Sequence, residues 1–517
     1  MTVVVVVLAV VAVLALLALV HRWLWVRLVR DTTRAGGAAR RTGTVLAFAL
    51  PVLALAALTA GRAGAPFWLQ QVVAWPGYMW LAVLLYLTLA MLVAEPARRL
   101  WLRRLSRTGA AAAAPATPGP GAPGTPGGPA PTSDICPDLA GTTPAGADVP
   151  QPTDAHGAGT PGSATAVGAE APRPAGAGGA GNARGAAAVA ADVPQPAGAG
   201  GVETLRDSTT AEDRQAAGVG GAGTPGDPTA AGDPQAAGVG GVPVSRRVFV
   251  ARVAGGAAAA AALATVGTGT YGVLRGPRVK RVKVPLARLP RAAHGFRIAV
   301  VSDVHLGPVL GRAHTQRIVD TVNRTQPDLI AVVGDLVDGS VHDLGPAAEP
   351  LRLLRSRLGS YFVTGNHEYF SGARQWVDHV RELGLTPLEN ARRELPHFDL
   401  AGVNDVQGES EGQGPDFRAA LGDRDRSRTA VLLAHQPVVI HDAVRHGVDL
   451  QLSGHTHGGQ LWPGNYLAEL ANPTVAGLER YGDTQLYVSR GAGAWGPPVR
   501  VGAPSDITVV ELASYQA

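Results

Sequence analysis

Four long stretches of the chain carry no charged residue and are rich in small and aliphatic side chains: residues 2–20, 42–61, 72–94 and 253–274. Each is long enough to cross the hydrocarbon core of a bilayer, which takes about 20 residues of helix. In lipid every backbone polar group needs an internal partner, so these stretches must form helices. The fourth stretch is rich in Ala, Gly and Thr and is only weakly hydrophobic. The sequence therefore predicts a membrane protein.

The basic residues that flank these stretches are distributed unevenly. Arginines cluster after the first stretch, up to Arg41, and again after the third, up to Arg107, whereas the loop between the second and third holds only Arg62. Loops rich in Arg and Lys tend to stay in the cytoplasm. We therefore expect residues 1–107 to form a membrane region with three transmembrane helices, an external N-terminus and a cytoplasmic exit near Arg107.

Residues 108–244 differ in composition from the segments before and after them. They are dominated by Pro, Gly and Ala, and the words ADVPQP and QAAGVGG each occur twice. Such a segment cannot bury enough apolar surface to offset the conformational entropy that is lost on ordering. The sequence predicts a disordered linker here.

A pair of arginines precedes the fourth stretch, in the run SRRVF from Ser245 to Phe249, which resembles a twin-arginine export signal. We therefore predict a signal anchor or fourth transmembrane helix over residues 245–276, a twin-arginine export machinery as a partner, and an extracytoplasmic position for the residues that follow. The basic residues from Arg275 to Lys283 argue the other way, because positive charge tends to be retained inside. An ordinary Ala-rich helix that does not cross, with a cytoplasmic domain behind it, stays open as the alternative.

The chain has a net charge of +5, but the positive charge belongs to its first half. Residues 284–517 contain 21 Arg, no Lys and 26 acidic residues. The basic excess therefore flanks the apolar stretches and does not form a surface that could follow a phosphate backbone. We exclude nucleic acid as the main partner and expect the lipid bilayer instead.

A different pattern begins at Phe296, where short apolar runs alternate with helical stretches, as is typical of an α/β domain. Five of these runs end in side chains that can bind metal: RIAVVSDVH, DLIAVVGDLVD, YFVTGNHE, AVLLAHQP and LQLSGHTH. The carboxyl edge of an open α/β sheet is where such folds place their ligand sites. Glycines before Asp335, Asn366 and His455 permit close turns at this edge. The sequence predicts a metal site built from the ends of five strands.

The run ends contain, in order, Asp-x-His, Gly-Asp-x-x-Asp, Gly-Asn-His-Glu, a single His and Gly-His-x-His. Over residues 284–517 this set resembles the calcineurin-like metallophosphoesterase superfamily, and SGHTHGGQ, GNHEYFSG and VSRGAGAWGPPVR are similar to its YkuE-type branch of bacterial transmembrane or exported proteins. The resemblance implies an α/β fold, a four-layer α/β/β/α sandwich of two mixed sheets, preceded here by the transmembrane helices and the linker. Ser505-Asp506-Ile507, where Pro-Glu-Ile is expected, is a mild departure.

The resemblance also implies a site for two divalent metal ions. One ion would be held by Asp303, His305 and His457, the other by Asn366, His435 and His455, with Asp335 bridging both. His367 would protonate the leaving oxygen, Asp338 would orient His367, and Glu368 would support the loop. Nitrogen and oxygen ligands without thiolate suit Mn²⁺, Fe or Zn²⁺. Two such ions can ionise a bridging water and hold the oxygens of an in-line displacement at phosphorus.

The predicted function is that of a membrane-anchored, metal-dependent phosphoric ester hydrolase, which cleaves phosphodiester or pyrophosphate bonds through a metal-bridging hydroxide. Its expected substrate is a phosphorylated small molecule or a lipid-linked or envelope compound, by analogy with UDP-diacylglucosamine pyrophosphatases of this branch. A phosphomonoesterase or protein phosphatase and an inactive membrane scaffold remain alternatives. Trp462, Tyr466, Leu467 and Leu470 form either an apolar lip that faces lipid or part of the core.

Overall fold

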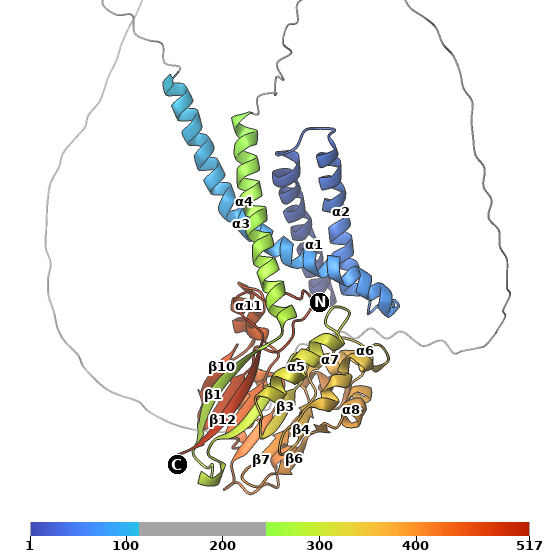
Figure 1. The fold of residues 1–517 in the computed structure, drawn as a ribbon, viewed down its shortest axis with the longest axis vertical. Coiled ribbons are helices and arrows are strands. Elements are labelled where there is room, and N and C mark those ends of the chain that lie inside the picture. The colour runs from blue at the N-terminus through green and yellow to red at the C-terminus, as the bar shows by residue number, and fades with distance from the viewer. Residues whose placement is uncertain (1, 113–244, 516–517) are drawn as a thin grey trace, which may run out of the picture. The chain divides into compact units, whose positions relative to one another are not determined.

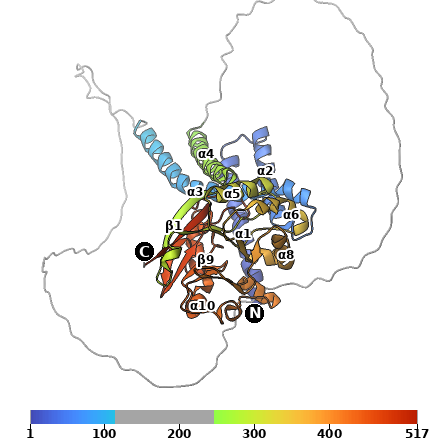
Figure 2. The same ribbon diagram turned by 60° about the horizontal axis from the view of Figure 1, so that its bottom comes forward.

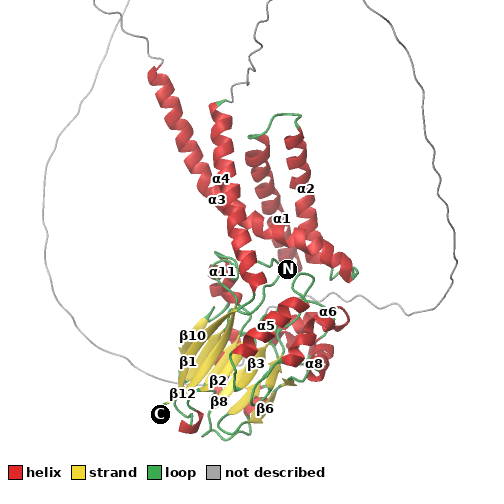
Figure 3. Cartoon of the chain, viewed as in Figure 1, coloured by secondary structure: helices red, strands yellow, loops and turns green. Residues whose placement is uncertain are grey.

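The computed structural model describes residues 2–112 and 245–515. The predicted linker, residues 108–244, lies almost entirely outside these ranges. In the described residues, four long apolar helices precede an α/β region along the chain (Figure 1). Figure 3 colours the helices and strands separately and shows that the strands are confined to the α/β region.

Four helices in the described part of the chain are long and apolar enough to cross a membrane. They are α1 (Thr2–Trp25), α2 (Ala38–Thr59), α3 (Phe67–Ala112) and α4 (Arg246–Arg275). Each coincides with one of the four apolar stretches, so the prediction of membrane-spanning helices is confirmed at the level of length and composition. Helix α3 continues to Ala112, a few residues past the predicted start of the linker.

The small residues of α4 explain why this helix is only weakly hydrophobic. Gly255, Ala258 and Ala262 recur along its buried face at the spacing of one helical turn. Small side chains let helix backbones approach closely, which favours association between helices in lipid, where the hydrophobic effect does not drive it. Helix α4 packs against α3, and both contribute to a buried cluster that includes Met91. Small volume, and not high hydropathy, therefore suits α4 to its neighbours.

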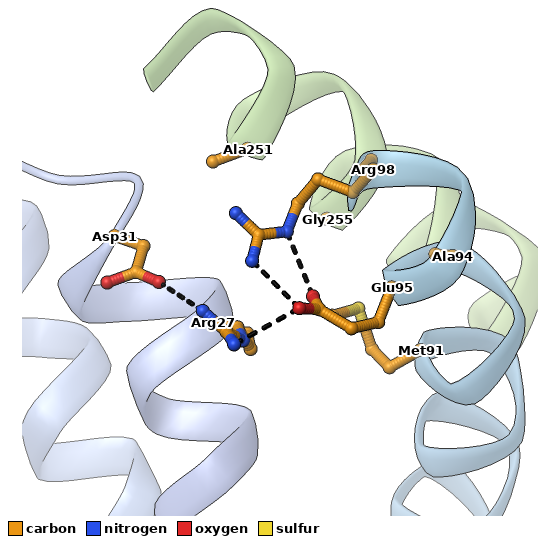
Figure 4. Close-up of a pocket in the computed structure, with 9 residues that line it drawn as sticks. Arg27, Asp31, Met91, Ala94, Glu95, Arg98, Ala251 and Gly255 are labelled. Atoms are coloured by element: carbon orange, nitrogen blue, oxygen red, sulfur yellow. Dashed lines mark hydrogen bonds and ion pairs between the residues drawn. The ribbon is translucent and has the colours of Figure 1, made fainter. Parts of the chain in front are cut away.

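An ion-pair cluster joins α3 to the π-helical turn (Val26–Arg30) that follows α1 (Figure 4). The Glu95 carboxylate lies 2.8 Å from Arg98 and 3.1 Å from Arg27. Nearby, Arg252 of α4 donates a hydrogen bond of 2.9 Å to the backbone carbonyl of Thr32. The arginine-rich segments that follow α1, end α3 and begin α4 therefore lie together.

Two six-stranded sheets form the α/β region. In spatial order the first sheet consists of β1 (Arg278–Leu286), β12 (Asp506–Ser514), β2 (Phe296–Val301), β3 (Leu329–Val333), β4 (Ser360–Val363) and β5 (Thr386–Pro387). The second consists of β10 (Gly477–Tyr481), β11 (Thr484–Val488), β9 (Leu450–Ser453), β8 (Ala430–Leu433), β7 (Asp399–Gly402) and β6 (Ala391–Glu394). Strands β2, β3 and β4 are parallel, as are β7, β8 and β9, so in each set the carboxyl ends lie at one edge. Both sheets also contain antiparallel pairs and are therefore mixed.

Apolar side chains on both faces of the central strands hold the layers together. Ile298 and Val300 of β2 point into the core between the two sheets, and the alternate residues Ala299 and Val301 pack under the outer helices. The outer helices are α5 (Arg312–Arg324), α6 (Val341–Ala348) and α8 (Ala373–Glu382) on the first sheet, and α9 (Phe417–Leu421) and α10 (Ile440–Arg445) on the second. Figure 2 labels α5, α6, α8 and α10. Burial on both faces explains why these strands appear in the sequence as continuous apolar runs. The predicted sandwich of two mixed sheets flanked by helices is confirmed.

Candidate metal centre

The seven predicted ligands follow the carboxyl ends of five strands, where Asn366 begins α7 (Asn366–Ser371) and His457 begins a 3-10 helical turn. They are Asp303 and His305 after β2, Asp335 after β3, Asn366 after β4, His435 after β8, and His455 and His457 after β9. Six of them fall into two groups of three whose ligand atoms lie within 4.8 Å of one another: Asp303, His305 and His457 in the first, and Asp335, His435 and His455 in the second. A further group of this kind consists of His305, Asp338 and His367. Side chains from both sheets thus meet at one place.

The first group is compact and almost inaccessible to solvent. His305 Nε2 lies 3.0 Å from His457 Nε2, and His457 Nε2 lies 3.3 Å from Asp303 Oδ1. Two ring nitrogens and a carboxylate oxygen therefore point at the same small volume. This is the mixed donor set that borderline divalent metals prefer.

The second group consists of Asp335, His435 and His455, and Asp335 also approaches the first group. His435 Nε2 lies 3.1 Å from Asp335 Oδ2, and His455 Nδ1 lies 3.0 Å from the side-chain oxygen of Asn366. Asp335 Oδ2 is also 3.7 Å from His305 Nε2, which belongs to the first group. One carboxylate oxygen thus lies between the two groups.

The hydrogen bonds of His305 and His435 determine which ring nitrogen faces Asp335. Their Nδ1 atoms lie 2.9 Å from Asp338 Oδ1 and 2.9 Å from the backbone carbonyl of Val333, respectively. Both partners can only accept, so each Nδ1 carries the hydrogen and each Nε2 of a neutral ring carries a lone pair. Two lone pairs are then turned toward the Asp335 carboxylate, an arrangement that cations between them stabilise. The donor set therefore fits divalent metal ions.

The carboxylates shift the pKa values of the same two histidines. Burial alone would lower the pKa of His305, but the charges of Asp338, Asp335 and Asp303 outweigh burial and raise it to about 9. Burial also opposes the charged form of His435, and the charges of Asp335 and Asp303 raise its pKa well above the usual value. Positive charge is thus favoured at both rings, as expected of a pocket that holds cations.

Backbone strain is concentrated at the strand ends. Among the described residues eight non-glycine residues have a positive φ, and five of them are predicted ligands. Their φ values are 52° at Asp303, 49° at His305, 54° at Asp335, 73° at His455 and 53° at His457. A left-handed backbone is unfavourable for residues with a Cβ and persists where the surrounding structure enforces it, most often at functional sites. The geometry of this edge is therefore maintained at a cost in stability.

The glycines beside the ligands serve close packing more than backbone freedom. A Cβ on Gly365 would overlap Asp335 Oδ1, and a Cβ on Gly454 would overlap Asp303 Oδ2. Of the three glycines that precede predicted ligands, only Gly334 has a positive φ, of 71°. Turn geometry and close packing both require glycine at position 334, where a Cβ would lie 2.6 Å from His435 Nδ1, whereas at the other two positions close packing to the ligands alone requires it.

Glu368 supports the loops, as expected from the sequence. Its carboxylate accepts hydrogen bonds from the backbone N–H groups of Asp335 at 3.0 Å, Leu336 at 2.7 Å and Gly365 at 2.6 Å. Burial raises its pKa to about 7. The three backbone bonds tie the loop after β3 to the start of α7 (Asn366–Ser371) and so fix Asp335 relative to Asn366.

Asp338 contacts two histidines at once. Its Oδ1 atom lies 2.9 Å from His305 Nδ1 and 2.6 Å from His367 Nδ1. Burial would raise the pKa of Asp338, but the two histidines outweigh burial and lower it to about 2. The sequence suggested the contact with His367, whereas the contact with His305 was missed, because residues 33 positions apart meet only in the folded sheet.

Arg500 is a further residue of the site that the sequence did not reveal. Its buried guanidinium donates to the backbone carbonyls of His457 at 2.9 Å, Arg490 at 2.6 Å and Gly493 at 2.7 Å, and thereby braces the loop that carries His457. Burial lowers its pKa to about 10. Arg500 ends the run VSRGAGAWGPPVR, but no spacing rule connects this run to the loop that carries His457.

A cleft of about 360 Å³ opens beside His305, Asp338 and His367. The ring of His367 packs edge-on against Phe370 and Trp495, with centroid distances of 5.5 and 5.7 Å. Residues of the α2–α3 turn line the same cleft, which the sequence did not predict. Of the seven candidate metal ligands, His305 lines this cleft.

The apolar residues that follow the loop of His455 and His457 lie on the surface. Trp462, which precedes α11 (Gly464–Ala471), and Tyr466, Leu467 and Leu470 within it are 50, 57, 71 and 84% exposed. They are therefore not part of the core, and an apolar lip is the alternative that stands.

Comparisons with known proteins identify the same region. Residues 296–459 match the profile of the calcineurin-like phosphoesterase family. A transmembrane protein with metallophosphoesterase domain from Danio rerio is 40% identical over 250 residues, which cover 46% of this chain and 57% of that protein. A metallophosphoesterase of Aquifex aeolicus is 34% identical, with 46% of this chain and 91% of that protein covered. The metallophosphoesterase YkuE of Bacillus subtilis is 29% identical, with 52% and 98% covered.

Among solved structures, a dimetal phosphatase from Danio rerio matches with a TM-score of 0.29 and 14% identity, covering 43% of this chain and 93% of that chain. This chain thus spans 57% of the Danio rerio transmembrane relative but nearly all of the shorter bacterial ones.

Proposed function

Because the chain belongs to the calcineurin-like phosphoesterase family, we propose that it is a membrane-anchored phosphoesterase that works with two divalent metal ions. The observation that carries this proposal is the position of Asp335, whose Oδ2 atom lies between His435 Nε2 at 3.1 Å and His305 Nε2 at 3.7 Å. A carboxylate approached from two sides by imidazole nitrogens is suited to bridge two cations.

In this proposal each metal ion has its own ligands, and one ligand is shared. Asp303, His305 and His457 would hold one ion, Asn366, His435 and His455 the other, and Asp335 both. When bound, the two ions would supply Lewis-acid stabilisation of the charge that develops on the phosphoryl oxygens. Mn²⁺, Fe²⁺ and Zn²⁺ all suit these donors.

The chain's own contribution to catalysis would be proton transfer by His367. Asp338 accepts the Nδ1 hydrogen of His367 at 2.6 Å, which leaves Nε2 to carry the proton that a leaving oxygen needs. The neighbouring rings of Phe370 and Trp495 limit the orientations of the imidazole. His367 is thus the candidate general acid, and Asp338 is its positioning residue.

The arrangement of the helices bears on which side of the membrane the active site would face. The arginine-rich segments after α1, at the end of α3 and at the start of α4 lie together, as the contacts of Arg27 with Glu95 and of Arg252 with Thr32 indicate. If this end faces the cytoplasm, α4 leads to the external side. The proposal therefore has residues 1–107 as a membrane region, 108–244 as a linker, 245–276 as a crossing anchor and 284–517 as an extracytoplasmic phosphoesterase domain.

A phosphodiester or pyrophosphate is the proposed scissile group, and a lipid-linked or envelope compound is the proposed substrate class. The four helices that are long and apolar enough to cross a membrane support this choice, because in a bilayer they would hold the site close to lipid. A phosphomonoester substrate is the competing candidate.

The test uses the full-length chain in detergent, stripped of metal and reloaded with Mn²⁺, Fe²⁺ or Zn²⁺. We expect metal-dependent hydrolysis of bis(p-nitrophenyl) phosphate that exceeds hydrolysis of p-nitrophenyl phosphate. Faster cleavage of the monoester would favour a phosphomonoesterase. If neither ester is hydrolysed with any of the three metals, the chain is a scaffold.

A further inference from the structure

The cleft beside His367 has walls from two parts of the chain. The strand-end loops supply His305, Asp338 and Trp495, and the membrane region supplies residues around the turn between α2 and α3, among them Leu58 and Arg62. The turn is therefore a wall of the cleft that His305, one of the candidate metal ligands, also lines.

The turn is held firmly enough to act as a wall. A Cβ on Gly77 of α3 would lie 2.6 Å from the Ala57 methyl group of α2, so glycine is needed for the helices to approach this closely. The Tyr78 hydroxyl donates a hydrogen bond of 3.1 Å to the backbone carbonyl of Ala57. Within the turn, the Gln70 side chain donates to the Ala65 carbonyl at 2.8 Å. These contacts fix both helix ends next to the cleft.

The membrane helices also contact the phosphoesterase region directly. Phe67, the first residue of α3, packs against the apolar cluster beneath α5 and α8. The Tyr86 hydroxyl of α3 donates to the backbone carbonyl of Trp462 at 3.0 Å. On α4, a Cβ at Gly269 would lie 2.7 Å from a methyl carbon of Val499. Three separate contacts therefore join the membrane helices to the phosphoesterase region, and the contact of Phe67 lies at the turn itself.

Arg62 gives this wall a positive charge. It is the only basic Lys or Arg side chain among the residues that line the cleft, where Asp338 and Asp343 are the acidic ones. Its guanidinium donates a long hydrogen bond of 3.4 Å to the backbone carbonyl of Leu58, and within the described residues it makes no ion pair with a carboxylate. An exposed guanidinium without a carboxylate partner can bind an anionic ligand.

The same wall is apolar on the side of α2. Leu58, which lines the cleft, is 44% exposed, and Leu55 and Val52 continue the exposed apolar surface along the helix. Across the cleft, Phe370 and Trp495 are 60% and 54% exposed. Leu58 thus joins the cleft to exposed apolar residues of α2, a helix that is long and apolar enough to span a bilayer.

We propose that the α2–α3 turn is part of the substrate site and that the substrate is an amphiphilic phosphoester. Its phosphorus lies at the metal centre, its alkyl or acyl chain lies along Leu58 and the exposed face of α2, and Arg62 binds an anionic oxygen of its headgroup. This inference rests on the proposed phosphoesterase function and adds to it a binding site for the chain and headgroup of the substrate, with Leu58 and Arg62 as its binding residues. The membrane helices thus select the substrate in addition to anchoring the chain.

The first arm of the test compares two esters with the same scissile bond, p-nitrophenyl methyl phosphate and p-nitrophenyl decyl phosphate, on the full-length chain in lipid nanodiscs. We expect a KM at least about tenfold lower for the decyl ester, because each buried methylene favours binding. Leu58→Gln should remove this difference. Arg62→Gln should raise KM for both esters by about 10–100-fold and leave kcat nearly unchanged, since it removes a charge-assisted hydrogen bond that acts in binding.

Arg41→Gln is the matched control, because it makes the same substitution at the opposite end of α2, outside the cleft. It should leave both KM values unchanged. Equal KM values for the two esters, with no effect of Arg62→Gln or Leu58→Gln, would overturn the inference while the phosphoesterase function stands.

The second arm does not depend on turnover. Decyl phosphate that carries a diazirine at the end of its chain is photolysed with the full-length chain, and the labelled peptides are identified by mass spectrometry. We expect label in α2 near Leu58, reduced by Leu58→Gln and by excess decyl phosphate. Label confined to the other helices would contradict the inference. If neither ester is hydrolysed, the proposed function fails, and this arm alone decides whether the turn binds an amphiphilic phosphate.

Discussion

Replacing Asp338 by Asn removes the negative charge that orients two histidines, His305 and His367. Asp338 Oδ1 lies 2.9 Å from His305 Nδ1 and 2.6 Å from His367 Nδ1. Asparagine has nearly the same volume, so the loop is expected to keep its shape. Its neutral amide oxygen is a weaker acceptor for both rings, and a flipped amide would place N–H donors against their N–H groups.

The expected loss can be worked out from these contacts. A carboxylate that accepts from a metal-ligating histidine raises the basicity of the ligand, and removal of such a partner weakens metal binding by about 10–100-fold. This corresponds to about 1.4–2.7 kcal/mol. In the proposed assignment His305 serves only one of the two ions, so one binding step should weaken strongly and the other much less.

The assay is a titration of the metal-free, full-length chain with Mn²⁺ or Zn²⁺ against a chromophoric chelator. Asp343→Asn is the matched control, because Asp343 lines the same cleft but pairs with Ser340 Oγ at 2.9 Å and with no histidine. We expect two separated binding steps in Asp338→Asn and wild-type behaviour in the control. Unchanged affinity in both binding steps of Asp338→Asn would refute the positioning role of this carboxylate.

Three further predictions concern other parts of the chain. His367→Ala should lose about 10²–10⁴-fold in kcat on alkyl esters but much less on p-nitrophenyl esters, whose leaving group needs no acid, and equal losses would contradict a general acid role. Burial lowers the pKa of His314 to about 3 in the folded chain. In the unfolded chain His314 is protonated below about pH 6.5. The contribution of His314 to the free energy of unfolding is therefore present above that pH and is lost as the pH falls toward 3. In the His314→Phe variant the midpoint temperature of thermal unfolding should therefore fall less with decreasing pH than in the wild type. His342→Phe, at an exposed position, should behave as the wild type. Arg246→Lys with Arg247→Lys should strand the phosphoesterase domain inside, so that protease added to intact protoplasts digests only the wild-type domain; a protected wild-type domain would show that it is cytoplasmic.

The strand ends could be predicted because their signal is local. A buried strand followed by Asp, Asn or His is visible in a window of ten residues, and parallel strands with short loops bring such ends to one edge of a sheet. The membrane helices were equally visible, since length and lack of charge define them. The sandwich followed from the resemblance of the run ends, and the structure has it.

The sequence could not show contacts that depend on tertiary packing. Arg500 reaches the loop of His457 from 43 positions away, and Asp338 meets His305 across two adjacent strands. The α2–α3 turn lies more than 200 positions before His305 and the other strand-end residues of the cleft that it lines. In the sequence Arg62 therefore appeared only as the single charge in a short loop. Such contacts follow from how helices and sheets pack and have no local spacing that marks them.

Metal content is the measurement that tests the central claim most directly. The full-length chain is purified without chelator and analysed by inductively coupled plasma mass spectrometry. It should contain about two equivalents of divalent transition metal per chain. Asp335→Asn removes the negative charge between the two groups of ligands and should lower the content to about one equivalent or none, with loss of phosphodiester hydrolysis. An Asp335→Asn chain that keeps the wild-type metal content and full turnover would contradict the account.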